Sequence, residues 1–159
     1  MPEASPVSRA LTAKGIPHRE FRHPGTIHSL DQAAKERGQT PDQIIRSIVF
    51  RLGKGDYVMV LVAGPSQISW QELRVHLNQS RLTMASEDEV LEATGYVPGA
   101  VSPFGLTSPI RILADQAIFI PDEISIGSGL RGVTIIMKSS DLKAALGEVE
   151  IASFLSNQS

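Results

Sequence analysis

The segment from residue 94 to residue 105, TGYVPGAVSPFG, constrains the fold of this chain more than any other. Glycine adopts backbone conformations that other residues resist and lets a ligand approach the main chain, whereas proline stiffens the chain and removes an N–H. This glycine–proline segment is therefore unsuited to a helix interior or a central strand, and it is too apolar for an ordinary solvated loop. It predicts a rigid pocket wall. A helix that ends at Gly95 and is followed by turns is the alternative.

A second glycine-rich loop follows at residues 127–132, which read GSGLRG. It does not fit a dinucleotide-binding fingerprint, because residues 133–137 have the pattern of a strand where that fingerprint needs a helix. One interpretation is a hairpin connection. The other is a set of backbone N–H groups that face an anionic or carbonyl oxygen, with Arg131 adding a phosphate contact. Together, the two segments suggest a pocket whose lining is largely backbone.

Composition excludes several function classes. The length of 159 residues fits one domain with a real core. A net charge of −2 argues against broad duplex binding, although a few local cations would suffice for one RNA end. The absence of cysteine excludes disulfides, thiol nucleophiles and cysteine-ligated zinc.

The histidines and the chain start carry further expectations. His18, His23 and His28 recur every five residues across turns, which is not a zinc-ligand spacing, so no metal is expected. Residues 1–10 lack the apolar core of a signal peptide, and no apolar run approaches membrane-spanning length. We therefore expect a cytoplasmic protein that does not engage a membrane.

Helices and strands are intermixed without a regular βαβ repeat. Capping patterns and helix stops predict helices at 7–14, 30–37, 70–77 and 87–93, with a further helix start at residues 40–43. A last helix is expected to be capped by Ser139 or Ser140 and to end near residues 146–147. Apolar and β-branched runs predict strands at 19–22, 45–52, 57–62, 81–84, 110–114, 123–126 and 133–137. We expect a single α+β domain over residues 1–159, with a mixed, barrel-like β-sheet flanked by helices.

The order and spacing of three motifs resemble the YbaK/prolyl-tRNA-synthetase editing-domain family. These motifs are G-x-x-P-G at 95–99, V-S-P-F-G at 101–105 and G-S-G-x-R-G at 127–132. The family comprises small aminoacyl-tRNA deacylases and the related insertion domain of bacterial prolyl-tRNA synthetases. The resemblance is strongest over residues 25–146. It implies the same barrel-like α+β fold, with the glycine–proline segment bordering the site for the aminoacyl group and the terminal adenosine.

Arg46 stands where the resemblance implies a lysine tied to activity. Arginine stays protonated, so Arg46 is unsuited to act as a general base. It can instead anchor the terminal phosphate or stabilise developing negative charge, unless it simply points to solvent. Ser47 can hydrogen-bond the substrate. Some family members carry an acidic residue at the position of Thr134, which is a second difference.

The resemblance implies a substrate-assisted hydrolase that needs no metal or cofactor, because an aminoacyl-tRNA ester is already activated and can be hydrolysed by positioning. The expected function is trans-editing of a small amino acid mischarged on a proline-type tRNA. A non-catalytic module that binds a tRNA acceptor end or an aminoacyl-nucleotide is the alternative, and a protein-interaction domain with a vestigial pocket is a third.

The resemblance implies a tRNA acceptor end as the partner. It leaves open whether an aminoacyl-tRNA synthetase delivers the substrate, and the oligomeric state is also open. Ser102 lacks the G-x-S-x-G context of a nucleophile. The candidate catalytic residue is Arg46, and the candidate substrate-binding residues are His28, Ser47, Gly95, Pro98, Gly99, Ser102, Pro103, Gly127, Ser128, Gly129 and Arg131.

Overall fold

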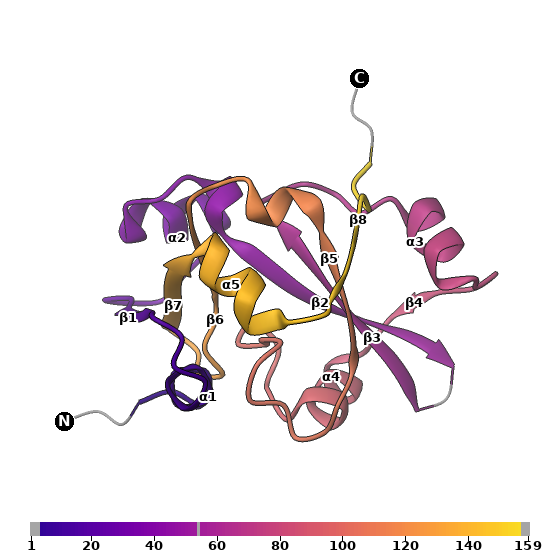
Figure 1. Cartoon of the computed structure of the whole chain (residues 1–159), viewed down its shortest axis with the longest axis horizontal. Helices are drawn as coiled ribbons and strands as arrows, with labels where there is room; N and C mark the ends of the chain where they lie inside the picture. Colours follow the sequence, from indigo (N-terminus) through magenta and orange to yellow (C-terminus); the bar gives the residue numbers. More distant parts are fainter. Residues whose placement is uncertain (1–3, 54, 157–159) are drawn as a thin grey trace.

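The computed structural model describes residues 4–53 and 55–156. The helices in these ranges are α1 (Pro6–Ala13), α2 (Leu30–Arg37), α3 (Trp70–Leu77), α4 (Glu87–Thr94) and α5 (Ser139–Leu146), with 3₁₀ turns η1 (Pro41–Gln43) and η2 (Gln116–Phe119). The strands are β1 (Arg19–Arg22), β2 (Ile45–Gly53), β3 (Asp56–Ala63), β4 (Thr83–Met84), β5 (Arg111–Asp115), β6 (Glu123–Gly127), β7 (Val133–Lys138) and β8 (Glu150–Ala152). The predicted α+β class is confirmed (Figure 1).

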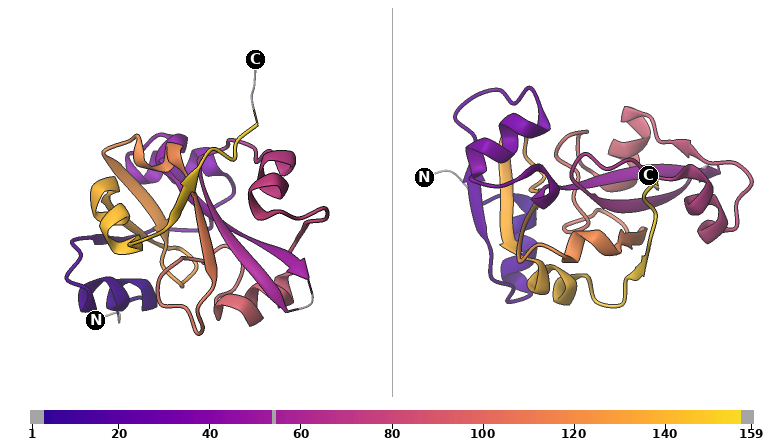
Figure 2. Two further views of the ribbon diagram at one scale, coloured as in Figure 1. Left: turned by 45° about the vertical axis from the view of Figure 1, so that its right-hand side comes forward. Right: turned by 90° about the horizontal axis from the view of Figure 1, so that it is seen from above.

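The strands form two sheets. The first is antiparallel, in the order β1-β7-β6, and the second is mixed, in the order β4-β2-β3-β5-β8. A parallel bridge between Ile44 and Ser125 joins the two where β2 begins beside β6. Figure 2 shows the sheet of β2 and β3 extending away from the other sheet rather than curling back to it.

The expectation of a barrel-like sheet is therefore wrong. Within the described residues, β1 pairs only with β7, whereas β4 and β8 end the second sheet, so no outer strands meet to close a barrel. The physical reason is the short contact between the sheets, since the described residues form one isolated bridge between them, at Ile44. This open junction leaves room for a pocket between β2 and β6.

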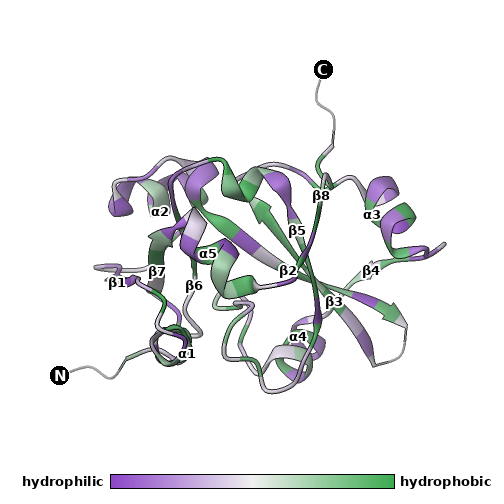
Figure 3. Ribbon diagram, viewed as in Figure 1, coloured by the Kyte–Doolittle hydropathy of each residue, from purple (hydrophilic) through white to green (hydrophobic). Residues whose placement is uncertain are grey.

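The central strand β3 carries the core. Its side chains alternate between the two sheet faces: Met59 and Leu61 join one apolar cluster, whereas Val58 and Val60 join another. All four are fully buried. Figure 3 shows apolar stretches along the strands, β7 among them, whereas helices such as α3 carry both polar and apolar residues.

Local capping signals fix most helix ends. The hydroxyls of Ser29, Ser69 and Ser86 each accept a hydrogen bond from the backbone N–H three residues on, as predicted. Gly38 and Gly95 end α2 and α4 in the left-handed conformation.

Three local expectations need correction. Residues 41–43 form only a 3₁₀ turn, because the chain must enter β2 two residues later. The N-cap of α5 is Lys138 rather than a serine, since Ser139 is already helical. Strand β8 was not predicted, because three residues are too short for a periodic pattern.

Candidate functional site

A pocket of about 940 Å³ opens where the two sheets meet. That volume lies in the range typical of small-molecule sites. Its walls come from the start of β2, from β6 and β7, from the loop before α2 and from α2 itself, with Gly99 and Val101 contributing from the glycine–proline segment.

Hydrogen bonds and close packing hold the glycine–proline segment against the glycine-rich loop. The Gly129 N–H donates to the Ala100 carbonyl over 2.9 Å. A Cβ at Gly127 would overlap the carbonyl of Val101, so only glycine allows this approach. On the other side, the buried Tyr96 hydroxyl donates to the Phe104 carbonyl over 2.6 Å. The two segments therefore form one continuous, rigid wall.

The lining of the pocket is positively charged. Arg37, Arg46 and Arg131 supply the charge, and the described residues of the lining include no aspartate or glutamate. The whole chain has a net charge of −2, so this concentration of guanidinium groups is local. A concave surface lined by one sign of charge attracts the opposite sign. The pocket is therefore suited to an anionic ligand.

Arg46 is engaged with the main chain at the edge of this pocket. Its Nε donates to the Gly64 carbonyl over 2.6 Å, and its Nη2 donates to the Ser66 carbonyl. Partial burial lowers the pKa of the Arg46 guanidinium through desolvation, yet the group stays charged at neutral pH. Arg46 therefore fixes the loop after β3 while it contributes charge to the pocket.

Ser47, next along β2, has a different environment. Successive side chains of a strand point to opposite faces, so Ser47 shares a face with the buried Ile45 and Val49 rather than with Arg46. Its Oγ is buried and has no hydrogen-bond partner among the described residues. Because an unpaired buried hydroxyl is costly, Ser47 offers the pocket a hydroxyl that a ligand can satisfy.

Six of the twelve candidate residues line the pocket: His28, Arg46, Ser47, Gly99, Gly127 and Arg131. The other six are not among the residues that line it: Gly95, Pro98, Ser102, Pro103, Ser128 and Gly129. The buried hydroxyls of Ser102 and Ser128 make turn hydrogen bonds, to the Phe104 N–H and to the carbonyls of Leu130 and Val133. The functional roles of all twelve stay predictions.

Arg37 lines the pocket but was not singled out from the sequence. A basic residue in the last turn of a helix is the ordinary complement to the helix dipole, so it carries no functional signal by itself. Its Nη1 donates to Ser125 Oγ over 2.8 Å, across 88 positions of sequence. No local pattern predicts that contact.

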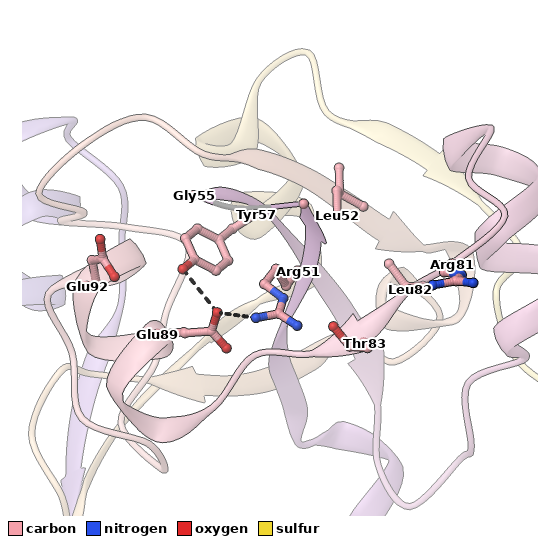
Figure 4. Close-up of a pocket in the computed structure, with 10 residues that line it drawn as sticks. Arg51, Leu52, Gly55, Tyr57, Arg81, Leu82, Thr83, Glu89 and Glu92 are labelled. Carbon is pink, nitrogen blue, oxygen red and sulfur yellow. Dashed lines mark hydrogen bonds and ion pairs between the residues drawn. The ribbon is translucent and has the colours of Figure 1, made fainter.

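A second pocket, of about 820 Å³, lies at the opposite end of β2 (Figure 4). Its charged centre is satisfied internally, because Arg51 forms an ion pair with Glu89 over 3.1 Å and the Tyr57 hydroxyl donates to the same carboxylate. This pairing distinguishes it from the first pocket. Within residues 4–53 and 55–156, no cluster of three metal-ligating side chains is found, and no helix is both long and apolar enough to cross a membrane.

The sequence profile of the aminoacyl-tRNA editing domain matches residues 24–145. The chain belongs to this family. It is 36% identical over 92 residues to a proline–tRNA ligase of Kosmotoga olearia, an alignment that covers 58% of this chain and 16% of the ligase. It is also 27% identical over 135 residues to the multifunctional Ser/Thr-tRNA deacylase ProXp-y of Escherichia coli K12, covering 82% of this chain and 80% of that protein.

The chain spans about a sixth of the length of the proline–tRNA ligases that it matches. A crystal structure described as that of a candidate trans-editing enzyme for prolyl tRNA synthetase superimposes with a TM-score of 0.85 at 24% identity, covering 96% of both chains. The structure of hypothetical protein APE2540 gives a TM-score of 0.85 at 20% identity and covers 95% of this chain and 99% of that one. These likenesses confirm the editing-domain fold.

Proposed function

We propose that this protein is an aminoacyl-tRNA deacylase that acts in trans on a small amino acid mischarged on a proline-type tRNA. The observation that carries the proposal is the pocket at the junction of the two glycine-rich segments, whose described lining has three arginines and no carboxylate. An aminoacyl-tRNA end combines a phosphodiester with a compact ester, and such a pocket suits both. The names of the relatives support the reaction class.

The reaction needs positioning more than a strong base. A water oxygen attacks the ester carbonyl carbon, and the bond from that carbon to the ribose oxygen breaks. One water proton ends on the leaving ribose oxygen, which becomes a hydroxyl, and the other is released to solvent as the amino acid leaves with a carboxylate. The vicinal ribose hydroxyl of the substrate orients the water. Gly99 and Gly127 bring main chain to the pocket surface, where N–H groups can stabilise the developing oxyanion. Alignment alone can lower the barrier by several kcal/mol.

Selectivity follows from the shape of the pocket. The wall around Val101 and Gly127 is fixed by backbone packing, so a larger side chain is excluded sterically. Steric exclusion of a larger side chain discriminates strongly between substrates. Discrimination against a smaller side chain is weaker, because one missing methylene lowers the binding free energy by only about 1–3 kcal/mol. The Ser47 hydroxyl adds preference for a substrate polar group.

We further propose that the reaction uses no metal or cofactor, that the partner is a tRNA acceptor end and that the protein acts in the cytoplasm. Whether a synthetase delivers the substrate stays open.

The test is a hydrolysis panel. A proline-type tRNA is charged with alanine, cysteine, serine, threonine or proline, and ester loss is followed with wild type, Arg46→Ala and the control Arg81→Ala, which removes an exposed arginine near the second pocket. We expect the wild type to hydrolyse a mischarged species but not prolyl-tRNA. Arg46→Ala should weaken this hydrolysis, and Arg81→Ala should retain it. Binding of every species without hydrolysis would establish the non-catalytic module instead.

A further inference from the structure

The guanidinium of Arg37 is held in one orientation at the wall of the pocket. Its Nη1 donates to the hydroxyl of Ser125, and its Nε donates to His23 Nε2 over 3.0 Å. Ser125 is fully buried and lines the same pocket. These two bonds engage Nε and Nη1, and Nη2 has no hydrogen-bond partner in the described part of the chain.

The support behind Arg37 continues through His23 to Glu36. The His23 side chain is 0% exposed, and its Nδ1 lies 2.6 Å from Glu36 Oε1. Because Nε2 accepts from Arg37, the ring proton resides on Nδ1 and is donated to Glu36. Gln32 Nε2 donates to the other carboxylate oxygen over 2.9 Å. This chain of bonds fixes the imidazole, which in turn fixes the guanidinium.

Arg37 differs from the other two arginines of the pocket. The fork of Arg46 is donated to the Gly64 and Ser66 carbonyls, and Arg131 is exposed at the rim. Arg37 is largely buried, and desolvation lowers its pKa to about 10, which leaves it charged at neutral pH. A partly desolvated cation gains more from an anionic ligand than an exposed one does.

We propose that Arg37 is the residue that binds the phosphate of the terminal nucleotide, and that His23 and Glu36 are positioning residues for it. This inference rests on the proposed function, because it assigns a subsite within the same pocket. Arg37 offers a preorganised, planar donor matched to phosphate oxygens. Arg46 then acts by ordering the loop that follows β3.

The test compares adenosine 5′-monophosphate with adenosine by isothermal titration calorimetry, which needs no hydrolysis. Arg37→Gln should lower affinity for the nucleotide about tenfold to a hundredfold, the usual range for a charge-assisted hydrogen bond, and leave affinity for adenosine unchanged. Lys35→Gln is the matched control, because it removes one positive charge from an exposed position on the same helix. It should retain the preference for the phosphate.

Further variants distinguish the loss of a phosphate contact from a general folding defect. Arg37→Lys and Ser125→Ala keep the charge while removing part of its anchoring, and each should give an intermediate loss of nucleotide affinity. His23→Phe keeps the edge contact with Phe21 but removes the acceptor; it should weaken binding of the nucleotide and spare adenosine. A general structural defect would weaken both ligands.

The source of the phosphate is tested with the dinucleotide cytidylyl-(3′→5′)-adenosine, which carries a phosphodiester as an RNA end does. Loss of its binding in Arg37→Gln supports the proposal, whereas a loss confined to the monophosphate contradicts it. Equal affinity of wild type and Arg37→Gln for both phosphates would overturn it, as would a wild type that binds adenosine as tightly as the nucleotide. Because these are binding results, absence of hydrolysis would refute the proposed function separately.

Discussion

The amide nitrogen of Gly129 lies 2.9 Å from the carbonyl oxygen of Ala100, and this bond ties the glycine-rich loop to the glycine–proline segment. Two stretches that are 22 residues or more apart in the sequence thereby become one wall of the pocket. The wall is built from main chain, so its shape depends on where glycine permits close approach.

Gly127→Ala should destabilise the protein by about 1–3 kcal/mol, because the new Cβ would overlap the Val101 carbonyl and lie 3.1 Å from that of Ala100. The matched control is Gly25→Ala, which also alters the pocket lining but meets nothing within 4 Å. Urea denaturation measures both variants. Equal stability of the two would show that the contact between the segments is not tight.

Ser47→Ala should be at least as stable as wild type, since it removes a buried hydroxyl that lacks a partner among the described residues. The same change should lower the deacylation kcat/KM about tenfold, the cost of one lost hydrogen bond to substrate. Both outcomes are checked on one preparation, with the melting temperature reporting stability and the deacylation kinetics reporting kcat/KM. A variant that is both less stable and fully active would contradict the assignment.

Arg46→Lys should lower stability by about 1 kcal/mol, because lysine cannot bond the Gly64 and Ser66 carbonyls with a planar fork. Greater proteolytic sensitivity of the segment around residue 65 should accompany this loss. Limited proteolysis followed by mass spectrometry provides the measurement. If the cleavage pattern were unchanged, Arg46 would not order this loop.

Glu150 provides a pH-dependent contribution to stability. The bidentate bond from Arg111, at 2.7 Å on both oxygens, is the main cause that lowers the pKa of Glu150 from 4.5 to about 2. A carboxyl whose folded pKa is depressed stabilises the fold above its unfolded pKa, and that stabilisation is lost as pH falls through the folded value. Glu150→Gln should therefore cost up to about 1 kcal/mol at pH 7, a modest value because the pair is exposed.

The difference between wild type and Glu150→Gln should shrink as the pH is lowered from about 4.5 toward 2. Urea denaturation at a series of pH values measures it. Glu148→Gln, two residues earlier and exposed, is the control for the loss of one negative charge at pH 7, since Glu148 has no ion pair in the described structure. A constant difference across this range would exclude the Arg111–Glu150 pair as its origin.

The parts of the fold encoded in local sequence were predictable. The Ser29 cap with the Gly38 stop bounds α2, and the apolar run from Tyr57 onward marks the central strand β3. The open junction between the sheets was not predictable, because it depends on where Ile44 meets Ser125 across 81 positions of sequence.

The candidate site, like the fold, could be predicted from the sequence only in part. The glycine–proline segment and Arg46 were identified from their composition and from the family resemblance, and Gly99 and Arg46 do line the pocket. Arg37 was missed because its role depends on bonds to Ser125 and His23, which only the folded chain brings together. Ser102 and Ser128 read as candidate polar contacts, yet their hydroxyls are used by the turns they form.

Single-turnover hydrolysis of a mischarged proline-type tRNA, with the protein in excess, tests the central claim most directly. We predict that seryl or alanyl ester is lost at least about a hundredfold faster than in buffer, a modest demand on positioning catalysis, while prolyl ester decays at its spontaneous rate. Decay of every ester at the spontaneous rate, with tRNA binding retained, would contradict the account and establish a binding module.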